Sequence, residues 1–328
     1  MNRRMYYVSN ATRHTKGDYM REALKKIIIL PIAAGLLYFI LFPEATFGAA
    51  AKIRHLLSVY SDNKGEDPVP LRQPEGVGCN ENMLLVADSG NGRLLRYALK
   101  DEGITSAEEI KVPQLTYPLK VRINSKGDIY TLDGKQRRIV HIGPDGMFRG
   151  YVDPKGLPSP EEYVPKSFAI DTDDNIYILD IFSARVLVLT PSGEYLRQIK
   201  FPEKFGFFSD ITVDFKGDIL LLDSTNARIV SANKQATAFS PVTESLREVI
   251  RFPASFISDD RGRIFLVDRN GGMVVALGQD GSFLGQLSQR GWKEGLLNHP
   301  SQACLNTKGK LFIADTSNNR VQIFEMLR

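Results

Sequence analysis

Short runs rich in Val, Ile, Leu, Phe and Tyr alternate with polar turns along most of the chain, and the alternation recurs at a nearly constant interval. Six copies begin at Pro74, Pro118, Pro165, Phe208, Pro253 and Pro300. Successive starts lie 44, 47, 43, 45 and 47 residues apart. Turns such as SKGD at 125–128 and FKGD at 215–218 divide the copies into strand-length segments, and no run has helical periodicity. The pattern predicts short antiparallel strands throughout.

Polar residues hold fixed places within the copies. The sixth residue after each start is Asn or Asp: Asn80, Asn124, Asp171, Asp214, Asp259 and Asn306. An aspartate follows nine residues later, or eight in the first copy: Asp88, Asp133, Asp180, Asp223, Asp268 and Asp315. Five residues beyond stand Arg93, Arg138, Arg185, Arg228 and Arg320, with Met273 in the fifth copy. Because the pair recurs, we expect a structural role at the turn between second and third strands, as exposed pairs that each contribute about 0–1 kcal/mol.

A repeat of about 40–50 residues with four short strands is typical of a β-propeller blade. We therefore expect an all-β, six-bladed β-propeller with four-stranded antiparallel blades at residues 71–328. Its repeats lie near 74–98, 118–142, 165–189, 208–232, 253–277 and 300–324. The sixth copy ends in its third strand, and residues 53–60 resemble fourth strands such as 195–199 and 283–287. Residues 51–70 are thus expected to be a closing strand, which covers the open edge of the last blade, and a linker.

These repeated charges, and the phrase GWKEGLLNHP at 291–300, resemble the NHL repeat and its glycine-rich lead-in. The resemblance covers residues 71–328, and five of the six copies carry both charges. It implies an NHL-repeat six-bladed propeller protein of the bacterial type, exported or membrane-anchored.

The N-terminal region predicts contact with a membrane. Residues 1–26 form a basic leader, and residues 27–50 are expected to form a hydrophobic helix whose first part reads IIILPIAAGLLYFILF. Small residues at 47–51 suit signal cleavage, and Met20 opens a normal signal start, so Met20 is a candidate initiator. An uncleaved anchor with its basic end in the cytoplasm is the alternative. Both interpretations place the propeller in the cell envelope, outside the cytoplasm (periplasmic or extracellular).

Charge gives no argument for nucleic acid. The net charge is +4, but residues 1–50 hold seven basic and three acidic groups, which leaves 35 of each sign in the remainder. A neutral body of this kind has no global attraction to an anionic polymer. RNA binding, known for some cytoplasmic NHL proteins, is therefore disfavoured.

The two cysteines lie on the first strands of copies one and six, which ring closure makes neighbours. Counted from Asn80 and Asn306, Cys79 and Cys304 differ by one position, which turns side chains to opposite faces of a strand. This register favours two buried free thiols, while an oxidising compartment keeps a disulfide open.

Other chemistry-bearing residues form no recognisable site. His55, His141 and His299 occupy unlike positions in their copies, so they predict no shared zinc. The stretch DTDDN at 171–175 falls where other copies place a turn and lacks the downstream glutamate of a calcium loop, so a solvated turn is expected. No GxSxG, HExxH or phosphate-binding glycine loop occurs in the propeller region. We assign no catalytic and no metal-ligating residue.

One repeat position departs from the family pattern. The second residue after the opening Pro, near the end of the innermost strand, is usually Gly in NHL repeats. Here it reads Gly76, Lys120, Ser167, Asp210, Ser255 and Gln302. Because innermost strands surround the axis, the five polar residues are expected to ring one mouth of a central channel, with Arg122 and Thr212 deeper. They either hold channel water or form a ligand-binding site, and both interpretations remain open.

The function expected from these features is a non-catalytic module that binds a protein, peptide or glycan on one propeller face outside the membrane. The alternative is a metal-dependent enzyme that uses the central channel, similar to the peptidyl-hydroxyglycine amidating lyases or the gluconolactonases. Only this alternative implies a cofactor, calcium or zinc. At the axis the sequence offers Asp210, Gln302 and a repelling Lys120, whereas calcium prefers several carboxylate or amide ligands.

Overall fold

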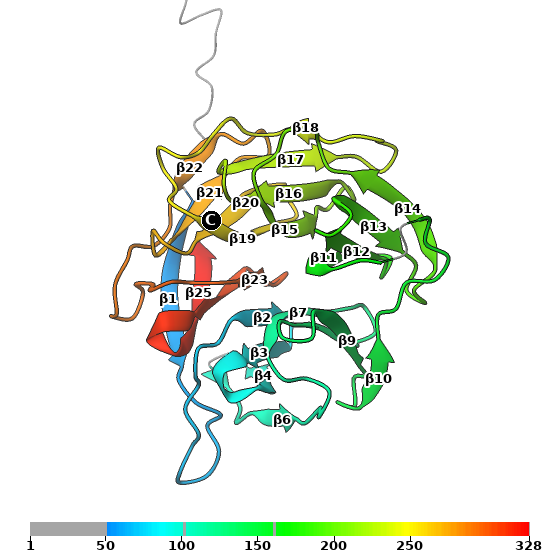
Figure 1. Cartoon of the computed structure of the whole chain (residues 1–328). Coiled ribbons are helices and arrows are strands. Elements are labelled where there is room, and N and C mark those ends of the chain that lie inside the picture. Colours follow the sequence, from blue (N-terminus) through cyan, green and yellow to red (C-terminus); the bar gives the residue numbers. More distant parts are fainter. Residues whose placement is uncertain (1–50, 101–102, 160–161, 328) are drawn as a thin grey trace, which may run out of the picture. The chain divides into compact units, whose positions relative to one another are not determined.

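The computed structural model describes residues 51–100, 103–159 and 162–327. These residues form six antiparallel sheets, which we number as blades 1 to 6 in the order of the sequence copies (Figure 1). The innermost strand of each blade lies beside that of the next, and the innermost strands of blades 6 and 1 are also neighbours. The ring is therefore closed, and the predicted six-bladed β-propeller is confirmed.

Each blade runs from an innermost to an outermost strand. Blade 1 holds β2 (Gly76–Cys79), β3 (Met83–Asp88), β4 (Arg93–Lys100) and two short outer strands that pair with β4, β5 (Gly103–Ile104) and β6 (Glu108–Ile110). Blade 2 holds β7 (Pro118–Ile123), β8 (Ile129–Asp133), β9 (Arg138–Ile142) and β10 (Phe148–Tyr151), and blade 3 holds β11 (Pro165–Ile170), β12 (Ile176–Asp180), β13 (Arg185–Leu189) and β14 (Tyr195–Lys200). Blade 4 holds β15 (Phe208–Val213), β16 (Ile219–Asp223), β17 (Arg228–Ala232) and β18 (Ser240–Pro241), and blade 5 holds β19 (Pro253–Ser258), β20 (Ile264–Asp268), β21 (Met273–Leu277) and β22 (Phe283–Gln286).

Blade 6 closes the ring with a strand from the start of the propeller. Its strands are β23 (Ala303–Leu305), β24 (Lys310–Asp315), β25 (Arg320–Leu327) and, outermost, β1 (Lys52–Val59). β1 pairs antiparallel with β25 from Lys52 opposite Leu327 to Val59 opposite Val321 (Figure 1). The closing strand expected at 53–60 is thus present, and it satisfies the backbone groups along the outer edge of β25.

The repeated Asn/Asp shapes the turn between the first and second strands. In blade 2, Asn124 Oδ1 accepts hydrogen bonds from the N–H groups of Lys126 (3.0 Å) and Asp128 (2.8 Å), and Gly127 takes a positive φ of +83°. A side-chain acceptor on N–H groups two and four residues ahead fixes a tight turn, and glycine adopts the left-handed conformation without strain. Asp171 and Asp259 make the same bonds in their blades, so the stretch at 171–175 is a turn as expected.

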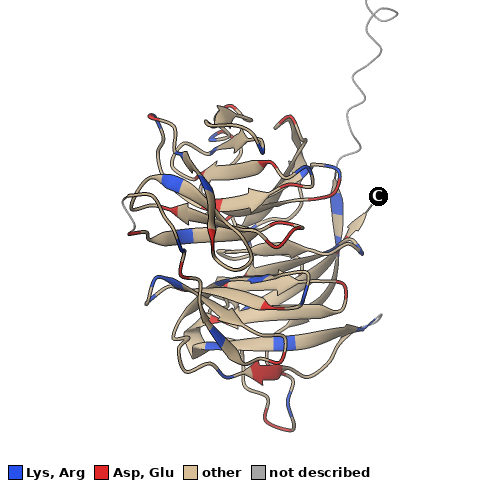
Figure 2. Cartoon of the chain, turned by 90° about the vertical axis from the view of Figure 1, so that its right-hand side faces the viewer, with Lys and Arg blue, Asp and Glu red and all other residues tan. Residues whose placement is uncertain are grey.

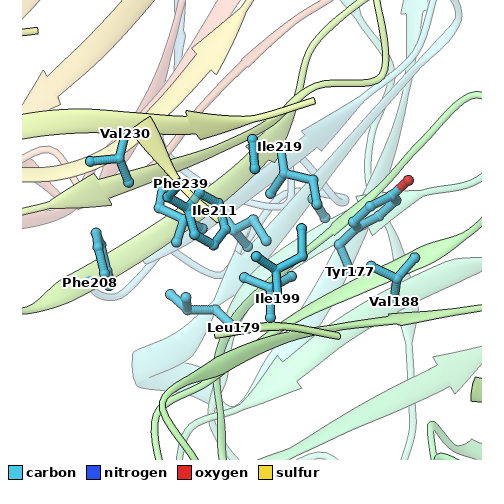
Figure 3. Packing of buried hydrophobic residues seen from close by; sticks show 13 residues of the cluster. Tyr177, Leu179, Val188, Ile199, Phe208, Ile211, Ile219, Val230 and Phe239 are labelled. Atoms are coloured by element: carbon cyan, nitrogen blue, oxygen red, sulfur yellow. The ribbon is translucent and has the colours of Figure 1, made fainter. Parts of the chain in front are cut away.

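The core consists of clusters between neighbouring blades. In the described residues six such clusters occur, one at each junction between blades. Figure 3 shows the junction of blades 3 and 4, where Leu179 and Ile199 of blade 3 pack against Phe208 and Ile211 of blade 4. Every residue of the second strands β8, β12, β16 and β20 is buried. Because the two neighbouring blades cover both faces of each blade, these strands are apolar apart from Thr131 of β8 and the aspartate that ends each strand.

A disulfide between Cys79 and Cys304 joins blades 1 and 6, with a Cα–Cα distance of 6.0 Å. The expectation of free thiols is wrong, and the reason lies in the geometry of stacked blades. The one-position difference does turn the two side chains to opposite faces of their own sheets. In a ring of stacked sheets, however, opposite faces of adjacent blades face each other, and both cysteines pack against the cluster between blades 6 and 1.

The predicted membrane segment at 27–50 lies outside the described residues. Within residues 51–327, two short gaps excepted, no helix has the length and apolar composition to cross a bilayer. Basic and acidic residues are interspersed on the side of the propeller turned toward the viewer in Figure 2, in keeping with the neutral charge of the body.

Candidate functional site

The polar residues expected near the axis come together in the interior. Lys120 of β7, Ser167 of β11, Asp210 of β15 and Ser255 of β19 form one hydrogen-bonded group, here called the axial cluster. None of these residues is more than 8% exposed. Because each strand is the innermost of its blade, the axial cluster ties blades 2, 3, 4 and 5 together.

Asp210 is the centre of the axial cluster. One carboxylate oxygen accepts hydrogen bonds from Lys120 Nζ, Ser167 Oγ (2.6 Å) and the Ile211 N–H (2.9 Å). The other accepts from Ser255 Oγ (2.7 Å) and the Phe256 N–H (3.2 Å). An ionised carboxylate offers about four lone-pair sites and no donor, so this set of donors requires the charged form.

The pKa values of the two charged partners reflect their burial. Burial lowers the pKa of Lys120 to about 8, and the attraction of Asp210 opposes this shift only in part. For Asp210, burial acts to raise the pKa, but the charges of Lys120 and Arg122 outweigh it and hold the pKa below its ordinary value. At neutral pH the axial cluster therefore contains a buried ion pair.

Gln302 completes the ring at the junction of blades 6 and 1. Its Oε1 accepts a hydrogen bond from the Val77 N–H at 3.1 Å, and among the described residues its buried Nε2 has no partner. A Cβ on Gly76 would lie 2.6 Å from the Leu119 carbonyl oxygen and 3.0 Å from Gln302 Oε1. Gly76 keeps the glycine of the repeat because Gln302 and the neighbouring backbone fill this space.

Arg122 lies two residues further along β7. Its Nη1 donates to the Val121 carbonyl at 3.3 Å. Burial lowers the pKa of Arg122, and the nearby charge of Asp210 works in the opposite direction. Arg122 thus adds a second cation to the side of the axis that already holds Lys120.

The axial cluster does not fit a divalent metal. Calcium and zinc sites combine several carboxylate, amide, imidazole or thiolate ligands. Here the one carboxylate is already neutralised by the Lys120 ammonium, and the other groups are two hydroxyls. The described residues also hold no group of three or more His, Cys, Asp and Glu that suits a metal ion. Lys120, which the sequence suggested would repel a metal ion, pairs with Asp210 and takes the place that a cation would need.

Comparison with known proteins agrees with the repeat pattern. Residues 297–324, in the sixth copy, match the family model of the NHL repeat. The sixth copy of this six-bladed propeller thus matches an NHL repeat. NHL repeat-containing protein 3 from Homo sapiens is 24% identical over 157 residues, which are 43% of this chain and 45% of that protein. The match thus spans less than half the length of this relative.

Solved structures share the six-bladed propeller fold of this chain at low identity. A gluconolactonase from Xanthomonas campestris superposes with a TM-score of 0.61 and 14% identity, over 85% of this chain and 95% of that chain. A chain of a nidogen–laminin complex gives a TM-score of 0.57 and 17% identity, over 76% of this chain and 99% of that chain. Identities this low show a shared fold and nothing about activity.

The repeated aspartates are buried, not exposed as the sequence analysis assumed. All six are 0% exposed, and each accepts hydrogen bonds from backbone N–H groups of the segment that leads into its blade. In blades 1, 3 and 6 the repeat arginine donates its Nε to the aspartate at 2.7–2.9 Å. The pair therefore pins the turn between second and third strands to the incoming connection, which gives it a structural role.

Blades 2, 4 and 5 depart from this pairing. Arg138 pairs with Asp153 instead of Asp133, and Arg228 Nε stays 3.5 Å from Asp223. In blade 5, which has Met273, an arginine occurs directly after the aspartate. Arg269 makes two hydrogen bonds to Glu75 of blade 1, at 2.9 and 3.0 Å, and these bonds raise the pKa of Arg269. Sequence reasoning missed this bridge. The usable signal was Arg269 itself, an arginine in the copy that has Met273 at the position of the repeat arginine.

Exposed apolar side chains gather at one end of the propeller. We call this end the loop face; it is formed by the Asp-to-Arg turns and by the connections that lead into each innermost strand. Its exposed apolar residues are Tyr60, Val69, Ile181, Phe182, Phe205, Phe207, Val249, Phe252 and Trp292. Phe207 and Phe252 directly precede the innermost strands of neighbouring blades, and Lys166 Nζ lies 5.4 Å from the Phe207 ring centre. The repeat pattern gave no hint of this set, because the connections differ in length and sequence.

The three histidines of the propeller do not meet. His55 packs edge-on against Phe324, and His141 stacks on Tyr130 with ring centres 4.5 Å apart. His299 contacts its neighbour Asn298 at 3.0 Å. His55 and His299 belong to blade 6 and its incoming connection, whereas His141 belongs to blade 2, and the contacts given for each histidine are local.

Proposed function

We propose that this NHL propeller is a non-catalytic interaction module that binds a protein or peptide through its loop face, outside the cytoplasm. The observation that carries the proposal is the concentration of exposed aromatic side chains on the loop face, among them Phe182 and Trp292, which are 62% and 79% exposed. Aromatic residues on a rigid scaffold are typical anchors of protein interfaces. A glycan is the other ligand class expected from the sequence.

The axial cluster disfavours the alternative of a metal-dependent enzyme similar to the amidating lyases or gluconolactonases. Lys120 and two serines satisfy Asp210, so a metal ion would have to displace an ammonium and its hydrogen bonds. The superposition on a gluconolactonase is a likeness of fold. Elemental analysis of the purified protein tests this point, since stoichiometric calcium or zinc would favour the enzyme.

The Cys79–Cys304 disulfide supports a location outside the cytoplasm, because disulfides form and persist in oxidising compartments. It agrees with the membrane segment expected at 27–50, which either anchors the chain or is removed. Mass spectrometry of the mature N-terminus separates these outcomes. A cytoplasmic protein with both thiols reduced in cells would contradict the proposed location.

The interaction test uses a photoreactive amino acid at single exposed positions in living cells. Phe207 and Phe252 report on the loop face, and Phe215, which is 50% exposed in a turn at the opposite end, is the matched control. We expect discrete protein adducts at 207 and 252 but not at 215. The adducts should disappear in a chain that also carries Phe182→Ser and Trp292→Ser.

Equal labelling at all three positions, or labelling that survives both serine substitutions, would contradict binding through the loop face. Adducts that are sensitive to glycosidase but not to protease would identify a glycan instead of a protein.

A further inference from the structure

In three blades a side chain of the fourth strand covers the guanidinium of the repeat arginine, and we call this side chain the cap. The capping residue stands opposite the second residue after the arginine: Glu109 opposite Leu95, Tyr151 opposite Val140 and Gln198 opposite Leu187. Because this position is fixed by strand pairing, the blades can be compared residue by residue.

Each cap contacts the outer part of the guanidinium. Glu109 Oε2 lies 3.6 Å from Arg93 Nη1, and Gln198 Oε1 accepts a hydrogen bond from Arg185 Nη1 at 2.8 Å. In blade 2 the guanidinium of Arg138 lies 3.5 Å above the Tyr151 ring. A carboxylate, an amide oxygen or an aromatic face thus covers the arginine in blades 1, 3 and 2.

Blade 4 has no such cap, because the equivalent residue opposite Val230 is Pro241. Arg228 Nη2 still donates to the Lys204 carbonyl at 2.7 Å, which holds the guanidinium in place. Among the described residues, its buried Nε makes no hydrogen bond and no partner is found for Nη1. The Arg228 side chain is 28% exposed, against 3% for Arg185 and 11% for Arg93.

The uncapped guanidinium lines a cleft of about 870 Å³ on the loop face. One wall comes from the connection at 203–205 and the other from the segment at 241–247. A second guanidinium, that of Arg247, is held at the cleft by its bond to the Thr225 carbonyl at 2.6 Å. Phe205, which is 40% exposed, supplies an aromatic surface in the same wall as Lys204.

We propose that this cleft is a carboxylate-binding site for a partner peptide, with Arg228 and Arg247 as the binding groups. The inference rests on the proposed function and gives it a ligand chemistry. The partner's carboxylate takes the place that Glu109 holds beside Arg93 in blade 1, where the same fold already shows a carboxylate as cap. Oriented guanidinium groups prefer planar, two-oxygen anions. An apolar residue next to the acidic one packs against Phe205 and Val242.

Two glutamates limit what the cleft accepts. Glu203 and Glu244 also line it, and within the described residues neither forms an ion pair with Arg228 or Arg247. With Lys204 the lining holds three cations and two anions. This small positive excess suits a single carboxylate better than a dianionic phosphate, because the glutamates repel added negative charge.

The test restores the missing cap without changing either arginine. Pro241→Glu and Pro241→Gln place in blade 4 the groups that cap blades 1 and 3, and Pro241→Ala is the matched control. The probes are N-acetyl-Phe-Glu-amide, N-acetyl-Gly-Phe with a free C-terminal carboxylate, and N-acetyl-Phe-Gln-amide, titrated by calorimetry at low salt. The first two probes distinguish a side-chain carboxylate from a chain terminus.

At least one carboxylate probe should bind wild type roughly tenfold more tightly than the neutral probe, as expected for charge-assisted hydrogen bonds. Pro241→Glu should remove this preference, while Pro241→Ala should keep it within about twofold, since alanine offers no acceptor. Equal binding of all probes, or an unchanged preference in folded Pro241→Glu, would overturn the carboxylate site. Loop-face adducts at 207 and 252 would then still stand, so a failure here is distinct from a failure of the proposed function.

Discussion

Removal of the axial ammonium should destabilise the propeller strongly. In Lys120→Met the Asp210 carboxylate keeps its two serine hydroxyls and two N–H donors but loses its charged partner. The side chains of Lys120 and Asp210 are 9% and 3% exposed, so solvent cannot replace the ammonium. Loss of one partner from a buried pair costs about 3–5 kcal/mol. We expect this decrease in the free energy of unfolding at pH 7.

Urea unfolding with the disulfide intact measures the effect. Lys155→Met is the matched control, because Lys155 pairs with Glu194 at 3.2 Å while both side chains are more than half exposed. Its loss should stay within about 0–1 kcal/mol. If Lys120→Met loses no more than this control, the axial cluster does not hold the blades together.

The pH dependence gives an independent check. Burial lowers the pKa of Lys120 to about 8 in the folded chain, against roughly 10.4 when unfolded. Between these values the unfolded chain binds a proton that folded Lys120 has released, so wild-type stability should rise with pH in this window. The stability of wild type minus that of Lys120→Met should therefore increase by up to about 1.4 kcal/mol per pH unit from pH 8 to 10. A flat difference would contradict the lowered pKa of Lys120 in the folded chain.

Three further predictions concern the ring and its turns. Cys79→Ser with Cys304→Ser opens a cross-link that spans 225 residues, and should lower the free energy of unfolding by about 3–5 kcal/mol in urea; an unchanged midpoint would mean that β1 alone closes the ring. Arg185→Met should cost about 3–5 kcal/mol because its aspartate is fully buried, whereas Arg138→Met, whose partner is exposed, should cost under about 1 kcal/mol; equal losses in thermal melts would refute the distinction. A chain that starts at Leu71 should aggregate on size-exclusion chromatography because β25 loses β1, and a monomer as stable as one starting at Ala51 would contradict the closure.

The repeat made most of the fold predictable. Asn124 and its equivalents recur because each fixes the same turn, and Asp180 and its equivalents recur because each accepts the backbone of an incoming connection. A structural role of this kind leaves a periodic trace, and so does a fourth strand such as β1, whose sequence resembles those of other blades. Features that occur once leave no such trace. The loop-face aromatic residues and the bridge between Glu75 and Arg269 were therefore recognised only in the structure.

The sequence by itself determined the number of blades, the strand order and the six positions that face the axis, because local pattern and fixed spacing specify them. Only the tertiary structure decided how these positions interact. Lys120 and Asp210 lie 90 residues apart in the sequence. Only the geometry across the ring decides that they form an ion pair with each other. The cysteines show the same limit, since a register that separates two side chains within one sheet brings them together between stacked blades.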